Sequence, residues 1–152
     1  MAEKEYAEKY LLGIRAVEKD LKNKRAELEA LRYKASGAGA IQYDKDRVQT
    51  SPQDYMTMAI ADIIEIEKQI KEDELSIEDK KGEAYAMVRK MAQPEHRAVI
   101  EWFYLNGISM AETAEHMSMS ERSAYYLKED ALENFGEILQ VCIPIQLNAE
   151  QF

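Results

Sequence analysis

Two ladders of apolar residues, spaced alternately four and three apart, constrain the fold of this chain more than any other feature. The first lies between residues 3 and 35, a stretch in which Gly13 is the one glycine and proline is absent. Its members are Tyr10, Ile14, Val17, Leu21, Lys24, Leu28 and Leu31. This spacing places them on one face of a long α-helix, with a polar interruption at Lys24. Because one apolar stripe cannot bury itself, the helix needs a partner.

A second ladder follows in residues 52–91. Ser51 and Pro52 form a strong helix start, because serine caps a helix N-terminus and proline suits the first helical position. The members of this ladder are Ala59, Ile63, Ile66, Ile70, Asp73, Ile77, Lys80, Ala84, Met87 and Met91. Gly82 leaves open a break or bend between 74 and 82. We expect the two ladders to pack as an antiparallel hairpin, and self-association through the same seams is the alternative.

Composition agrees with an all-α fold. The chain has 6 Gly and 3 Pro, few for the tight turns of a β-protein, and its 46% hydrophobic content suffices for a core. We expect a long antiparallel helical hairpin over residues 1–92, with a connector at 36–50. The single cysteine excludes an internal disulfide and a multi-cysteine zinc site. Apolar runs fall short of the ~20 residues of a membrane helix, and a signal peptide's apolar stretch is missing. These patterns predict a soluble, cytoplasmic protein without a membrane partner.

Residues 93–140 contain a succession of helix start and stop signals. We expect a first helix over about 95–105, opened by Pro94 and ended by Asn106-Gly107. A short helix reaches from Met110 to about Met117, and a longer one from Glu121 to about Leu139. Residues 141–152 then form an apolar tail with no evident partner.

The last two expected helices have the spacing of a helix-turn-helix. Ser109 and Ser120 precede them as capping residues. Ala114 allows close approach of the two helices, and Ala124 and Leu127 form the inward side of the second. The side chains expected outward or on its flanks are Glu121, Arg122, Ser123, Tyr125, Tyr126, Lys128 and Glu129. In a DNA-binding protein, such outward residues enter the major groove.

The stretch Gln93-Pro94-Glu95-His96-Arg97-Ala98-Val99-Ile100, with Phe103-Tyr104-Leu105-Asn106-Gly107 and Ser109 to Leu132, resembles region four of bacterial sigma factors. With the two long helices and the Val48-Gln49-Thr50-Ser51-Pro52 junction, residues 3 to 135 resemble the RinA/ArpU-like family of phage transcriptional regulators. The resemblance implies an all-α fold with a sigma-like helix-turn-helix. It also implies control of phage transcription through double-stranded promoter DNA, bacterial RNA polymerase, or both. By this match Ser120 caps the recognition helix, and the DNA-facing residues are Arg122, Ser123, Tyr126 and Lys128.

Two further residues join this candidate binding set. Tyr125 stands beside Tyr126, and two adjacent tyrosines can hardly both be buried, so at least one is expected to be an exposed contact residue. Arg97 is the remaining cation of the C-terminal segment. We therefore take both as candidate DNA-binding or partner-binding residues.

Charge supports a second interpretation. Residues 93–152 contain three basic residues, Arg97, Arg122 and Lys128, against ten acidic ones. Phosphate binding is driven by cations, so an acidic face weakens DNA binding. The alternative is an acidic phage-encoded interaction module that inhibits a host nucleic-acid-binding protein, such as a defence nuclease. A third interpretation is a structural oligomeriser, a homodimer joined by the heptad helices.

Signatures of catalysis are missing from the sequence: it has no phosphate-binding glycine loop, HExxH motif or nucleophile elbow. We therefore expect a protein that is not an enzyme and needs no cofactor or metal. His96 and His116 stand alone, so surface or capping roles are expected of them rather than ligation. Trp102, Phe103 and Tyr104 are expected in the core.

Overall fold

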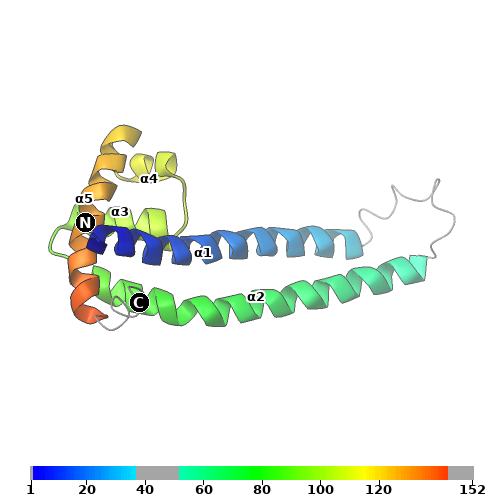
Figure 1. Ribbon diagram of the computed structural model, residues 1–152. Coiled ribbons are helices and arrows are strands. Elements are labelled where there is room, and N and C mark those ends of the chain that lie inside the picture. Colours follow the sequence, from blue (N-terminus) through cyan, green and yellow to red (C-terminus); the bar gives the residue numbers. More distant parts are fainter. Residues whose placement is uncertain (1, 37–51, 144–152) are drawn as a thin grey trace. The chain divides into compact units, whose positions relative to one another are not determined.

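The computed structural model describes residues 2–36 and 52–143, and every regular element in these two stretches is a helix (Figure 1). The all-α class expected from the sequence is confirmed. The elements are α1 (Ala2–Ala35), α2 (Pro52–Val88), α3 (Pro94–Val99), the π-helix η2 (Ile100–Leu105), α4 (Met110–His116) and α5 (Glu121–Cys142). The connector, the Ser51 cap and the tail beyond Ile143 lie outside the described residues.

The described chain divides into two compact units. One, here called the arm unit, is Asp20–Ser76, and the other, the base unit, joins Met1–Lys19 to Ile77–Phe152. The base unit therefore combines the beginning of the 1–92 segment with the C-terminal helices, a grouping that the ladders alone do not suggest. The helix α2 runs from Pro52 to Val88 without the break considered near Gly82.

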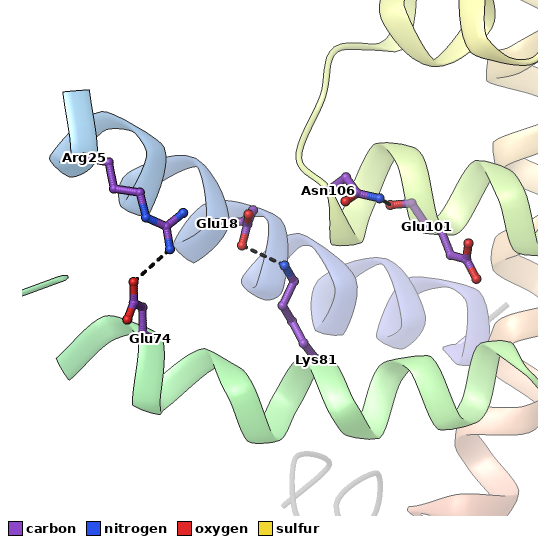
Figure 2. Close-up of polar contacts among 6 residues, drawn as sticks. All are labelled: Glu18, Arg25, Glu74, Lys81, Glu101 and Asn106. Atoms are coloured by element: carbon purple, nitrogen blue, oxygen red, sulfur yellow. Dashed lines mark hydrogen bonds and ion pairs between the residues drawn. The ribbon is translucent and has the colours of Figure 1, made fainter. Parts of the chain in front are cut away.

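In the arm unit, the two ladders bury one another. Leu21 and Leu28 of α1 are buried, as are Ala59 and Ile70 of α2. The segments run antiparallel, because later residues of α1 pair with earlier residues of α2. The pairs are Lys24 with Asp73 at 2.6 Å, Arg25 with Glu74 at 2.9 Å and Arg32 with Glu67 at 2.9 Å. Figure 2 shows the Arg25–Glu74 pair.

In the base unit, the first turns of α1 pack closely on α5. A Cβ atom added to Gly136 of α5 would lie 2.7 Å from the carbonyl oxygen of Glu3, so the site requires glycine. At the next residue of α1, Lys4 Nζ lies 2.5 Å from Glu129 Oε2 of α5. Further along α1, Lys81 Nζ lies 2.8 Å from Glu18 Oε2 (Figure 2). The large, fully buried side chains of this unit include Leu11, Ile14, Tyr104, Leu132, Phe135 and Leu139.

Arg15 of α1 holds the segment that precedes α4. Its Nη1 donates to the carbonyl oxygens of Phe103 at 2.5 Å and Ile108 at 2.7 Å. Its guanidinium carbon lies 4.0 Å from the centre of the Phe103 ring. The helix η2 ends at Leu105, and Asn106 follows it as the C-cap. The backbone N–H and the side-chain amide of Asn106 both donate to the Glu101 carbonyl at 2.8 Å (Figure 2).

Gly107 then reverses the chain. Its φ of +67° is a left-handed conformation in which glycine carries no Cβ penalty, so the predicted Asn106-Gly107 stop is confirmed.

Candidate binding face of helix α5

Both capping serines predicted for the C-terminal helices are in place. Ser109 Oγ accepts a hydrogen bond from the backbone N–H of Glu112 at 3.1 Å, at the start of α4. Ser120 Oγ accepts from the backbone N–H of Ser123 at 3.1 Å, at the start of α5. These bonds satisfy donors that a helix N-terminus otherwise leaves unpaired, so each helix has a defined first turn.

The turn between α4 and α5 is tight. Ser118 has a φ of 55°, the one positive φ among the described residues other than glycine. The backbone N–H of Met119 donates to the Ala114 carbonyl at 3.0 Å and closes the turn. A left-handed serine costs roughly 1 kcal/mol, so surrounding contacts must hold it there.

Small residues let α4 and α5 contact each other within the base unit, as Figure 1 also shows. Ala114 is 3% exposed and Ala124 is fully buried. Thr113 is buried as well, and its hydroxyl donates to the Ser109 carbonyl at 2.8 Å. Leu127, expected on the inward side, is half-buried. Residues 110–132 are thus two helices in contact rather than one rod.

Four of the six candidate binding residues lie together on the exposed side of the first turns of α5. Arg122, Ser123, Tyr125 and Tyr126 are all exposed. The guanidinium carbon of Arg122 lies 5.7 Å from the centre of the Tyr126 ring, and Nη2 lies 3.5 Å from the Tyr126 hydroxyl. The two tyrosine rings meet edge to face at 6.1 Å. We call these four residues the α5 face.

Lys128 is not on the α5 face, and the outward position expected for it was wrong. Its side chain is buried, with Nζ 4.7 Å from the centre of the Tyr125 ring and 5.6 Å from that of Phe103. Nζ also lies 3.4 Å from Glu129 Oε1. The sequence did contain the signal, because Ala124, Lys128, Ala131 and Phe135 follow a four-three ladder on the inward side of α5. A lysine can occupy such a position by packing its aliphatic stem against aromatic rings.

Arg97 is also engaged away from the α5 face. Its Nη1 donates to the carbonyl of Met91 at 2.6 Å, and the Ala92 carbonyl lies at 3.4 Å. The half-buried guanidinium therefore binds backbone carbonyls of the segment that follows α2. Of the three basic residues that the sequence offers after position 92, Arg122 alone presents its charge on the α5 face.

A cation from α1 was missed by the sequence analysis. Lys4 bonds Glu129, and this hydrogen bond lowers the pKa of the Glu129 carboxyl and raises that of the Lys4 ammonium. One acidic residue of α5 is thereby neutralised by a side chain from the opposite end of the sequence. No sequence pattern within α5 predicts the ion pair between Lys4 and Glu129.

The two histidines lie in different environments. His96 is buried rather than superficial, with Nδ1 3.3 Å from the Asn134 side-chain nitrogen, so the surface role expected for it was wrong. His116 is exposed and stacks on Trp102, with ring centres 4.1 Å apart and planes 2° from parallel. Of the aromatic residues expected in the core, Tyr104 is fully buried, and Trp102 and Phe103 are half-buried.

Within residues 2–36 and 52–143, side chains that could hold a metal do not gather in groups of three or more. In the same stretches, none of the helices combines the length and apolarity needed to cross a membrane. No family model, curated protein or solved structure matches the chain.

Proposed function

We propose that this protein is a phage-type transcriptional regulator, with α4 and α5 as a sigma-like helix-turn-helix that acts on promoter DNA together with RNA polymerase. The observation that carries the proposal is the α5 face. It lies directly after a short helix and a tight turn, which is where a recognition helix presents its base-reading side chains. The capped N-terminus of α5 adds a positive dipole end that favours approach to phosphate.

Arg122 and Ser123 are the proposed base-reading residues. An arginine contacts the two major-groove acceptors of a guanine, worth about 1–3 kcal/mol of discrimination against another base. Tyr126 packs beside the Arg122 guanidinium and limits its freedom, so less entropy is lost when the arginine binds. Phosphate contacts contribute less than usual, because Lys128 and Arg97 are occupied inside the base unit. We therefore propose that RNA polymerase contributes to retention on the promoter.

A pool of random-sequence DNA duplexes, selected by retention on the full chain with and without RNA polymerase at low salt, tests this proposal. We expect a sequence motif to be enriched and Arg122→Ala to lose the preference at a guanine of that motif. Arg25→Ala is the matched control, because Arg25 carries the same charge but lies in the arm unit. If neither selection enriches a motif, promoter recognition is excluded.

The engagement of Lys128 and Arg97 favours a second candidate. With those two cations withdrawn, the surface that α4 and α5 offer is dominated by exposed acids such as Glu112, Glu115, Glu121 and Asp130. Such a surface suits a basic protein whose own ligand is a nucleic acid, and the α5 tyrosines supply apolar contact area. This candidate predicts a stoichiometric complex that salt dissociates, is weakened by Tyr126→Ala, and forms without enrichment of any DNA motif.

A further inference from the structure

The helix α2 carries a second ladder that faces away from its seam. Ala61, Ile64, Lys68, Glu72 and Leu75 follow one another at intervals of three or four residues, and all are exposed. At 3.6 residues per turn, this spacing places them on one face of the helix. The seam residues Ile66, Ile70 and Asp73 lie on the opposite side, where α1 covers them. We call these five exposed residues the outer stripe.

Large apolar side chains of the outer stripe are exposed to solvent, where polar side chains would be expected on a helix face that stays in water. Ile64 is 61% exposed and Leu75 is 64% exposed. Met56 and Ile60, on the neighbouring turns of α2, are each 50% exposed. In the arm unit, α1 of the same chain already occupies the α2 seam. A second helix that binds the hairpin as it stands would use a different face of α2, and the outer stripe offers exposed apolar side chains.

The outer stripe is complementary to itself when two copies run antiparallel. Placing Lys68 of one copy opposite Glu72 of the other pairs opposite charges twice, once on each side of the two-fold axis. The same register places Ile64 of each copy within one residue of the position opposite Leu75 of the other, so the two apolar side chains can meet. A parallel arrangement would instead place Lys68 against Lys68 and Glu72 against Glu72, which like charges disfavour.

The order of Lys68 and Glu72 along α2 favours ion pairs between two copies over an ion pair within one helix. Within one helix, glutamate four residues before lysine is the more stabilising order, whereas Lys68 precedes Glu72 here. Among the described residues, neither side chain has an ion-pair partner within 4.0 Å. Both charges are therefore available to a second molecule.

From this complementarity we propose that the outer stripe of α2 binds the outer stripe of a second copy, antiparallel, about a two-fold axis that crosses the stripe midway between Lys68 and Glu72. The interface is a pair of α2 helices with Ile64–Leu75 contacts at its ends and Lys68–Glu72 ion pairs at its centre. It is independent of the function proposed for α5, because it uses only arm-unit residues.

Sedimentation equilibrium of the full chain tests the dimer. We expect a reversible monomer–dimer equilibrium that Lys68→Glu or Glu72→Lys weakens by about tenfold at low salt, since each reversal sets like charges together on both sides of the axis. The double variant Lys68→Glu/Glu72→Lys restores the pairs in reverse and regains part of the lost dimer affinity, because its charge order also favours a competing ion pair within each helix. Glu27→Lys, an exposed α1 reversal with the same change in net charge as Glu72→Lys, leaves it unchanged. A monomer at every soluble concentration overturns the proposal, as does a double variant weaker than both single ones.

Disulfide trapping tests the register in a Cys142→Ser background, which removes the natural cysteine. An equal mixture of Ile64→Cys and Leu75→Cys chains should form a disulfide-linked heterodimer rapidly. Ile64→Cys alone should not, because the antiparallel register separates the two copies of residue 64 by about twelve residues, or ~18 Å along the helix. Rapid self-linking of Ile64→Cys would indicate a parallel pair and refute the proposed arrangement.

Discussion

Lys24 of α1 and Asp73 of α2, the polar interruptions that face each other in the two ladders, form an ion pair with Nζ and Oδ2 2.6 Å apart. A second carboxylate, Asp20, lies 3.1 Å from the same ammonium. Any shift of the ladders by a heptad would leave Lys24 or Asp73 facing apolar side chains. A single buried or half-buried polar pair can set the register of two helices in this way.

Replacing one member of this pair should therefore destabilise the protein more than replacing both members. We expect Asp73→Leu to lower the thermal midpoint of unfolding, because Lys24 then faces a leucine with Asp20 as its remaining partner. The double variant Lys24→Leu/Asp73→Leu should recover or exceed the original midpoint, because the ladders become continuously apolar. Circular dichroism on heating measures both, with Arg25→Leu/Glu74→Leu as the control at a half-exposed pair. A double variant less stable than Asp73→Leu would contradict this account.

Gly136→Ala should destabilise the protein although alanine is the better helix former. The added Cβ meets the Glu3 carbonyl oxygen at 2.7 Å, so α1 must move, at a net cost of roughly 1–3 kcal/mol. Gly82→Ala is the matched control, because nothing lies within 4 Å of the Cβ added there. It should stabilise the protein by roughly 0.5–1 kcal/mol. Urea unfolding monitored by circular dichroism measures both free energies. Equal effects of the two substitutions would show that α1 does not approach α5 closely.

Ser118→Gly should stabilise the turn between α4 and α5. Glycine removes the penalty of the left-handed backbone, and the gain of about 0.5–1 kcal/mol is reduced by its greater freedom when unfolded. Ser118→Val should destabilise, because a β-branched residue is disfavoured at this φ. Hydrogen exchange of the Met119 amide, which closes the turn, reports the change locally. Slower exchange is expected in the glycine variant and faster exchange in the valine variant, and the reverse order would contradict the strain assigned to Ser118.

The Lys4–Glu129 pair should make stability depend on pH in acid. Because Lys4 lowers the folded-state pKa of Glu129 below its ordinary 4.5, the pair stabilises the protein above that value. Its contribution is lost as the pH falls through the lower, folded pKa. At the alkaline end, the raised pKa of Lys4 means that the contribution is lost only above 10.5. Urea midpoints should thus fall less steeply below pH 4.5 in Lys4→Met than in the unaltered chain. Parallel curves would mean that the pair does not form.

The parts of the fold that follow from local patterns could be predicted from the sequence. The ladders, the serine caps and the Asn106-Gly107 stop each depend on residues within a few turns of one another, and each is present in the structure where the residues are described. The burial of Lys128 could also have been predicted, because its spacing from Ala124 and Ala131 places it on the inward side of α5, where we had not expected a charged residue.

Contacts between distant segments could not be predicted in this way. Glu3 approaches Gly136, Lys4 neutralises Glu129, and Arg15 holds the carbonyls of Phe103 and Ile108. For each of these residues, the neighbouring positions in the sequence do not indicate which distant residue it contacts. Because Lys4 offsets one carboxylate of α5, part of the charge near the candidate site could not be predicted from α5 alone.

The contact of Glu3 with Gly136 has a consequence for how the molecule is made. The first turns of α1 pack against α5, a helix that is synthesised long after them. Until then, Tyr10 of α1 lacks the Phe135 ring that it contacts in the folded unit. Such a pairing of segments distant in sequence raises the contact order and slows folding, so this unit should reach its native state only after α5 has been synthesised.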